Sequence, residues 1–260
     1  MELTDKVIAN ITQLEFKKSN NIHQNTNSIM YIDENNIYKI VDSELFYPKE
    51  FERNIDYLIN NEIPNTPKIY EKIYRYKKFY GYVMEHIKNS ITFKEAIETN
   101  IDEQIKTKAI IDIHNALKEL HKRNIVLGDI HIENFIISQD DGYLVDLDYM
   151  RFPGEENKFI NCYDIKPYNS NNKITKSSIY TDIVKTTIAS LSLLLKMNLE
   201  SLTNSNDKSL HLEDIYNTVI IATNNKLLIN YFKDLMNGKE LYFDDFLKEN
   251  NYYIEKIKTI

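Results

Sequence analysis

Residues 124–148 constrain the fold of this chain more strongly than any other stretch. They form a polar loop followed by two apolar segments of strand length, 134–138 and 143–146. Between these segments lies Gln139-Asp140-Asp141-Gly142, and Asp-Gly between apolar runs is a strong signal for a hairpin turn. We therefore expect two short antiparallel strands that carry the chain out of the loop and back beside it.

This hairpin would bring three polar side chains toward one small volume. Asp129 and Asn134 belong to the loop, and Asp146 ends the second strand, which returns beside the first. Carboxylate and amide oxygens are ligands that Mg²⁺ prefers, and a carboxylate can also accept a proton. The three residues are therefore candidates for hard-cation and proton chemistry.

The same residues carry a resemblance to a known family. Asp129-x-x-x-x-Asn134 followed by Val145-Asp146-Leu147 resembles the catalytic loop and metal-binding triplet of the protein kinase superfamily, here in a divergent bacterial-type Ser/Thr form. In that family the first Asp accepts the proton of the acceptor hydroxyl. The resemblance thus implies that Asp129 is the catalytic base, that Asn134 and Asp146 hold Mg²⁺, and that ATP donates the phosphate.

The resemblance covers roughly residues 28–250, in the expected order and spacing. It implies an α+β, two-lobed protein-kinase-like fold, with a small, mainly antiparallel β N-lobe that carries one main helix and a larger, mainly α-helical C-lobe. We expect one kinase-like domain over residues 1–260, with the N-lobe at 1–86 and the C-lobe at 87–260.

A single lysine interrupts the β-forming run at 36–41. Lys39 on its own would be an ordinary edge-strand residue, but the resemblance makes it the lysine that holds the α and β phosphates of ATP. In the family a Glu from the following helix pairs with this lysine. Here the helix frame puts Asn54 in that slot, and Glu50 and Glu52 are the nearby alternatives.

The segment Tyr82-Val83-Met84-Glu85-His86-Ile87 is similar to the family's hinge. The resemblance implies that Met84 guards the back of the nucleotide pocket and that the backbone of Glu85 and Ile87 contacts adenine. An ordinary strand leaving a sheet would have the same local pattern.

Two departures from the family pattern concern the phosphates and the catalytic loop. No Gly precedes Gly81, so a Ser/Asn stretch at 19–28 takes the place of the Gly-rich loop. His131, which we include among the catalytic candidates, stands where Ser/Thr protein kinases commonly have Lys, and Asp148 stands where they have Gly. Gly-Asp-x-His-x-x-Asn is more similar to aminoglycoside and choline phosphotransferases, although the chain has no evident room for their inserted helices.

Bulk properties exclude several classes of protein. A net charge of −7 and a pI near 5.5 give no basic footprint for nucleic acid. Cys162 is the single cysteine, so no intrachain disulfide can form. The start of the sequence lacks a signal-peptide pattern, and the apolar run at 183–195 contains Lys185, so we expect a buried helix, no membrane insertion and a cytoplasmic protein.

Hydrophobic spacing and turn residues predict the other elements. Within the helices, His114 is expected in the core, His121 at a helix end or the surface, and Asp182 either as a helix N-cap or bound to the catalytic-loop backbone. We expect strands at 28–32, 36–41, 68–75 and 78–84, a first amphipathic segment at 5–16, helices at 48–60, 92–99, 102–123, 183–197, 212–223, 226–236 and 243–255, and an irregular section at 149–178.

Three functional hypotheses remain from the sequence. The first is an ATP-dependent Ser/Thr protein kinase, and the second is a small-molecule hydroxyl kinase of the aminoglycoside or choline phosphotransferase type. The third is a catalytically silent kinase-like module that binds nucleotide or a partner. Joint retention of Lys39, Asp129, Asn134 and Asp146 argues against the third, because a binding scaffold needs none of them. The acceptor, protein or small molecule, is not identified.

Overall fold

A computed structural model describes most of the chain. The described residues are 2, 15–21, 26–41, 48–155, 164–167, 174–204 and 209–250, with side chains described from residue 28 onward in the first sheet. All but the last two residues of the segment expected at 5–16 lie outside these ranges, and so does the end of the helix expected at 243–255.

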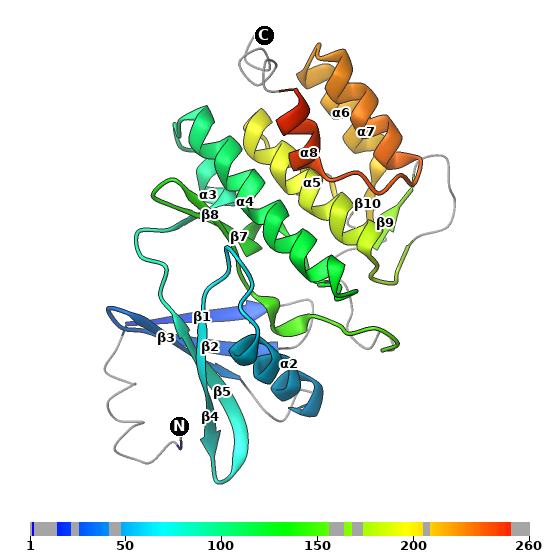
Figure 1. Ribbon diagram of the computed structural model, residues 1–260. Helices are drawn as coiled ribbons and strands as arrows, with labels where there is room; N and C mark the ends of the chain where they lie inside the picture. The colour runs from blue at the N-terminus through cyan, green and yellow to red at the C-terminus, as the bar shows by residue number, and fades with distance from the viewer. Residues whose placement is uncertain are drawn as a thin grey trace.

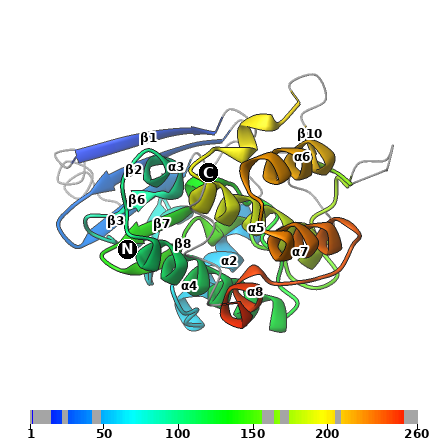
Figure 2. The same cartoon turned by 90° about the horizontal axis from the view of Figure 1, so that it is seen from above.

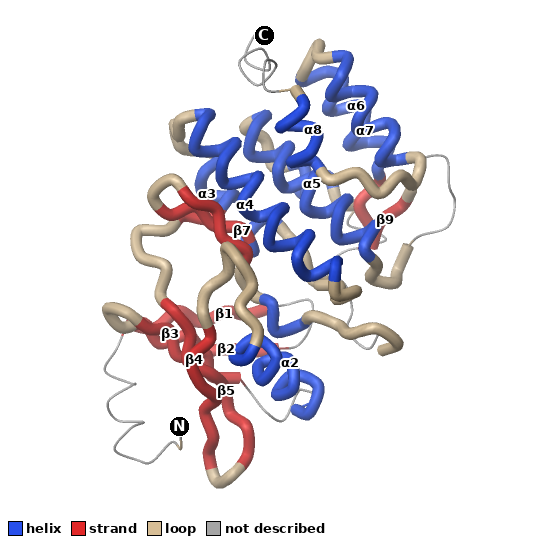
Figure 3. The backbone as a smooth tube through the Cα atoms, in the orientation of Figure 1, coloured by secondary structure: helices blue, strands red, loops and turns tan. Residues whose placement is uncertain are grey.

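One part of the molecule is an antiparallel sheet with a single helix beside it (Figures 1 and 3). The sheet has five strands in the order β1-β2-β3-β5-β4. Part of the Ser/Asn stretch at 19–28 forms the ends of β1 and β2, which pair from Glu15 opposite Ile32 to Asn21 opposite Thr26. The strands are β1 Glu15–Asn21, β2 Thr26–Ile32, β3 Asn36–Val41, β4 Ile69–Arg75 and β5 Lys78–Glu85.

Helix α2, Pro48–Asn60, packs on this sheet through aromatic side chains. The Phe51 ring lies 5.9 Å from that of Phe79, 6.4 Å from that of Tyr82 and 5.8 Å from that of Tyr149. Burying a ring of this size contributes about 1.5–3 kcal/mol. Because Tyr149 follows the Asp146 segment, this cluster ties the sheet and its helix to the loop that carries the candidate site.

The other part is mainly helical (Figure 3). Helix α5 lies between α4 and α7, as Figures 1 and 2 show from two directions. Two of these helices begin at an N-capping residue. Asp102 caps α4, and Asn225 accepts from two N–H groups at the start of α7. The helices are α3 Phe93–Ile97, α4 Glu103–Lys122, α5 Ile179–Leu195, α6 Leu212–Ala222, α7 Lys226–Met236 and α8 Phe243–Glu249.

Helix α5 begins four residues earlier than its apolar run suggested. Ser178 caps it by accepting from the Thr181 N–H, and Thr181 completes a capping box. Lys185 is buried with the rest of the helix, which confirms a core helix. Within the described ranges, no helix has the length and apolarity needed to cross a membrane.

The hairpin after residue 134 forms, but its turn differs from the prediction. β7 Phe135–Ser138 and β8 Asp141–Leu144 pair with Ser138 opposite Asp141, which leaves Gln139 and Asp140 as the turn. Gln139 supplies the left-handed conformation, with φ of 54°. Gly142 lies in β8 instead, where a Cβ atom would stand 2.2 Å from the Ala109 carbonyl oxygen, so glycine serves close packing on α4.

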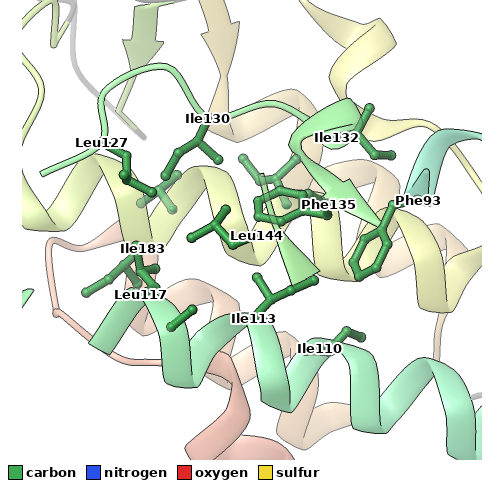
Figure 4. Close-up of a cluster of buried hydrophobic side chains, with 14 of the residues drawn as sticks. Phe93, Ile110, Ile113, Leu117, Leu127, Ile130, Ile132, Phe135, Leu144 and Ile183 are labelled. Carbon is green, nitrogen blue, oxygen red and sulfur yellow. The ribbon is translucent and has the colours of Figure 1, made fainter. Parts of the chain in front are cut away.

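A buried apolar cluster fixes the hairpin and the preceding loop to the helices. Figure 4 shows side chains of α3, α4, α5, the loop and both hairpin strands meeting in one core. Two short sheets complete the fold: β6 Ile91–Thr92 pairs with β7, and β9 Asp164–Lys166 in the section expected to be irregular pairs in parallel with β10 Ser209–His211. Short 3₁₀ turns are η1 Ile132–Asn134, η2 Leu147–Tyr149 and η3 Leu199–Leu202. The α+β, two-lobed architecture expected from the sequence is confirmed.

Candidate active site

The hairpin gathers Asp129, Asn134 and Asp146 at one end of β7 and β8. The Val145 N–H donates to the Asn134 carbonyl at 2.9 Å, and the Asn134 side-chain amide donates to the Asp129 carbonyl at 3.2 Å. Asp146 follows in a left-handed conformation, φ 61° and ψ 46°. Residues other than Gly seldom adopt this conformation, and those that do cluster at functional sites.

A buried carboxylate on α5 holds the loop that precedes Asp129. Asp182 is fully buried and accepts from the backbone N–H groups of Leu127 at 2.7 Å and Gly128 at 3.1 Å. This confirms that Asp182 binds the backbone of the loop before Asp129, since Ser178 is the N-cap of α5. Gly128 has φ of +78°, and a Cβ atom there would lie 2.6 Å from a serine hydroxyl, so glycine suits the position before Asp129.

Two basic residues reinforce this anchor. His121 was expected at a helix end or the surface, but it is buried, with Nε2 3.2 Å from the Asp182 carboxylate and Nδ1 2.8 Å from the Tyr242 hydroxyl. His121 lies in the last turn of α4, which confirms the helix-end prediction, but the surface alternative was wrong because position alone does not show which face of α4 meets α5. Lys185 donates from Nζ to the Gly128 carbonyl at 3.0 Å. A lysine inside the apolar run at 183–195 is the feature of the sequence that could have indicated this buried contact of Lys185.

The site contains polar oxygens that the described part of the protein leaves without hydrogen bonds. They are Oδ1 of Asp129, Oδ1 of Asn134 and Oδ1 of Asp148, all buried. The Asp146 side chain, in contrast, is 45% exposed. Buried oxygens without partners are costly and are retained where a ligand, an ion or a proton completes them. The Asn134 amide oxygen, together with the Asp146 carboxylate, suits Mg²⁺.

Lys39 joins this site from the sheet. Its Nζ lies 2.8 Å from the Asp146 carboxylate and 2.7 Å from that of Asp148, and only 7% of its side chain is exposed. Asp148 also accepts from the Tyr82 hydroxyl at 2.8 Å. In the sequence, Asp148 stands out only as a departure from the family's Gly, and Tyr82 only as part of the hinge segment. The Asp at position 148, where the family has Gly, is the feature of the sequence that could have indicated a further carboxylate at the site.

The pKa values in this cluster shift with burial and with charge. Burial alone lowers the pKa of Lys39, but the carboxylates of Asp146 and Asp148 outweigh it and hold that pKa well above its ordinary value. For Asp146, whose side chain is 45% exposed, the desolvation of the carboxylate beside the protein raises the pKa, and the Lys39 ammonium more than offsets this, so the pKa lies below its ordinary value. Burial raises the pKa of Asp148 despite Lys39, and it raises the pKa of Tyr82 well above normal, so that the hydroxyl remains a donor.

The α2 residues considered as partners of Lys39 have other contacts. Asn54, in the slot of the family's Glu, is fully buried and donates to the backbone carbonyls of Asp148 and Met150. Glu52 accepts from Lys72 at 3.0 Å and from the Tyr74 hydroxyl at 2.7 Å, since its side chain lies over β4. Glu50 lies half-buried in the first turn of α2.

The hinge segment leaves β5 next to the site. Met84 is buried. The Glu85 N–H donates to the Lys68 carbonyl at 2.8 Å, and the His86 N–H donates to the Asn35 carbonyl at 3.0 Å. The Ile87 N–H donates to no protein group within the described ranges. This backbone donor follows the strand at the position where the family's hinge contacts adenine.

Two further groups lie near Asp129: Arg151, which the sequence did not mark, and the catalytic candidate His131. Arg151 is buried, and its backbone pairs with Val126 ahead of the loop, at 2.8 and 3.1 Å. Burial lowers the pKa of Arg151, opposed by the carboxylates of Asp182 and Asp129. His131 is partly exposed, with Nδ1 4.0 Å from the Glu133 carboxylate.

No group of three or more His, Cys, Asp or Glu side chains in the described ranges is arranged to hold a metal ion. The candidate ligands here are one carboxylate, Asp146, and one amide, Asn134. Mg²⁺ is usually bound by one or two protein oxygens, with phosphate and water completing its octahedron. The donor set therefore fits a cation brought in with nucleotide.

A two-lobed α+β fold with Lys39, Asp129, Asn134 and Asp146 gathered at one loop defines a protein-kinase-like phosphotransferase. Residues 25–198, more than half of the chain, match the family described as Lipopolysaccharide core biosynthesis protein (WaaY), and the chain belongs to this family. Membership supports the kinase-like fold and a kinase activity at the level of the superfamily. No curated protein sequence matches the chain.

Proposed function

We propose that this protein is an ATP-dependent kinase that phosphorylates a sugar hydroxyl of the lipopolysaccharide core, with a heptose as the acceptor. The observation that carries the proposal is that Asp129 Oδ1 and Asn134 Oδ1 are buried without a hydrogen-bond partner in the described part of the chain, on the loop next to Asp146, which contacts Lys39. Family membership supports the choice of acceptor, because the family is described by lipopolysaccharide core biosynthesis and its activity is phosphorylation of heptose.

In this proposal Lys39 contacts the phosphates of ATP with its ammonium group, as a fixed positive charge. Asn134 and Asp146 would hold Mg²⁺, which neutralises phosphate charge when bound. Phosphoryl transfer depends more on positioning and charge than on covalent help from the protein. The rigid loop anchored by Asp182 then serves to keep Asp129 and Asn134 in fixed relation.

Asp129 is the base in this reaction. The acceptor hydroxyl oxygen forms a bond to the γ-phosphorus, the bond from that phosphorus to the β,γ-bridging oxygen breaks, and ADP leaves with the bond electrons. The acceptor proton passes to the Asp129 carboxylate. A buried carboxylate oxygen without a hydrogen-bond partner in the described part of the chain is suited to this role, because no competing donor occupies it.

The adenine is expected at the hinge. The Ile87 N–H, which has no acceptor within the described ranges, would donate to the ring, and the Glu85 backbone would contact the neighbouring edge. His131 remains a candidate for contact with the acceptor, since it follows Asp129 closely and is partly exposed. The Gly-Asp-x-His-x-x-Asn loop, similar to that of small-molecule phosphotransferases, supports a sugar over a protein side chain.

The test is transfer of ³²P from γ-labelled ATP with Mg²⁺ to three acceptors: unphosphorylated lipopolysaccharide core oligosaccharide, free heptose and a generic protein. Wild type and Asp129→Asn are compared. We expect label in the oligosaccharide that depends on Asp129. Label only in protein would establish a Ser/Thr protein kinase instead, and MgATP binding without any transfer would favour the silent module.

A further inference from the structure

The two carboxylates that contact Lys39 have unlike surroundings. The Asp146 side chain is 45% exposed, whereas that of Asp148 is completely buried. Asp148 is also the closer of the two to the ammonium nitrogen, at 2.7 Å against 2.8 Å, and it accepts a further hydrogen bond from the Tyr82 hydroxyl. One acid therefore faces the open site, and the other lies behind the lysine.

The protein fixes Asp148 from two sides. Tyr82 is almost fully buried on β5, next to β3, where it pairs with Lys39 across the strands. On the other side, the Asn54 amide of α2 donates to the backbone carbonyls of Asp148 at 2.8 Å and Met150 at 2.7 Å. The helix that supplies an acid in related kinases here supplies an amide, and this amide holds the segment on which the acid stands.

Of the two carboxylates that contact Lys39, only Asp146 would also have to bind a metal ion. If Asp146 is a ligand for Mg²⁺, a cation competes with Lys39 for the same carboxylate. Asp148 Oδ1 has no hydrogen-bond partner in the described ranges, but the side chain is completely buried, whereas that of Asp146 is 45% exposed. A cation entering from the open site therefore meets Asp146, and the contact of Asp148 Oδ2 with Lys39 persists when Asp146 turns to the metal. A lysine that binds phosphate needs such a partner, because an unpaired buried ammonium is costly.

We infer that Asp148 is the positioning residue for Lys39, and that it replaces the helix acid of related kinases, with Tyr82 and Asn54 holding it in place. The inference rests on the proposed function, since it assigns to Lys39 the task of binding phosphate. It explains how the chain keeps the lysine while α2 offers Asn54 in the usual acidic slot.

A double-mutant cycle tests the inference. MgATP binding is measured by calorimetry for wild type, Asp148→Asn, Lys39→Met and the double variant. Asp148→Asn keeps the shape of the side chain and removes its charge. We expect roughly 10- to 100-fold weaker binding, the worth of one charge-assisted hydrogen bond. In the Lys39→Met background the same change should alter affinity less than about 3-fold, because Asp148 acts through the lysine.

A matched control is available in the helical lobe. Asp244 is also fully buried and also paired with lysines, at 2.8 Å from Lys118 and 2.7 Å from Lys248. Asp244→Asn should lower stability in urea and leave MgATP affinity within about 2-fold. If Asp148→Asn does not fold, Tyr82→Phe, which removes one hydrogen bond to the carboxylate, should still weaken MgATP binding by roughly 3- to 10-fold.

The outcomes separate the inference from the proposed function. Wild-type affinity in Asp148→Asn, or an equal effect with and without Lys39, would overturn the positioning role while sugar phosphorylation stands. If Asp148→Asn does not fold, unchanged binding by Tyr82→Phe would also overturn the role. Absence of MgATP binding by wild type would overturn both.

Discussion

Replacing Asp182 by Asn tests how the catalytic loop is held. The carboxylate is fully buried and accepts from the Leu127 and Gly128 N–H groups at 2.7 and 3.1 Å, with His121 Nε2 at 3.2 Å. Asn offers one oxygen in place of two, so one backbone N–H would face an amide NH₂ group. Substitution therefore removes one acceptor without altering side-chain volume.

The magnitude follows from these contacts. Loss of a hydrogen bond to a charged acceptor costs about 1.5–3 kcal/mol, and a buried N–H without a partner costs about 1–3 kcal/mol. The two effects overlap, so Asp182→Asn should lower the free energy of unfolding by about 2–4 kcal/mol, more than either effect alone at its low end and less than their sum. Turnover should fall as well, since Asp129 directly follows the released segment.

Urea unfolding followed by circular dichroism measures the first effect, and amide hydrogen exchange at Leu127 and Gly128 locates it. Both amides should lose protection. Asp234→Asn, which disturbs an exposed pair with Lys239, is the control and should stay within about 1 kcal/mol of wild type. A loss below about 1 kcal/mol for Asp182→Asn, or unchanged exchange at both amides, would refute the anchoring argument.

Four further outcomes are expected. Asp146→Asn should weaken Mg²⁺-dependent ATP binding at least about 10-fold with little effect on folding, by removal of the charged ligand. Asp129→Asn should keep MgATP affinity and lower turnover at least about 100-fold, as expected for loss of a general base. Glu52→Gln should leave MgATP affinity unchanged and cost at most about 1 kcal/mol of stability, because Glu52 pairs with Lys72 at the half-buried edge of α2. Burial lowers the pKa of His114 from 6.5 to about 4, so the native state binds fewer protons than the unfolded state between these values, and stability should fall by about 3 kcal/mol as pH drops through this window.

Each of these four predictions can be contradicted by a specific result. Equal ATP affinity of Asp146→Asn and wild type in Mg²⁺ would remove the metal role, and unchanged turnover of Asp129→Asn would remove the base. Weaker nucleotide binding by Glu52→Gln would restore a link between Glu52 and Lys39. For the pH effect, His114→Phe should flatten the unfolding profile between pH 6.5 and 4, and an unaltered profile would assign the dependence to other groups.

Local patterns in the sequence predicted most elements within a few residues. The bounds of α2 follow from Pro48 and hydrophobic spacing, and those of α4 from the Asp102 cap and hydrophobic spacing, which act over one or two helical turns. The hairpin was also predicted, but the turn was misplaced, because Gly142 serves packing against α4 and not a turn conformation. A glycine needed for close approach and one needed for a turn look alike in a sequence.

The residues of the loop could be named from their spacing, and the structure brings Asp129, Asn134, Asp146 and Lys39 together. The partner of Lys39 could not be named. Its nearest carboxylate, Asp148, lies over a hundred residues away in the chain, and no local rule links the two positions.

The sequence by itself indicated the helices, the strands and the loop residues, because short-range periodicity and fixed spacing are written along the chain. The two-lobed α+β class followed from the resemblance of that loop and of the order of elements to the protein kinase superfamily. Only the tertiary structure decided that Asp148 and Tyr82 enclose the lysine, that Asn54 holds a backbone segment, and that His121 pairs with Asp182. These contacts join distant segments, and they depend on how the faces of helices and strands pack, which burial of the whole core decides.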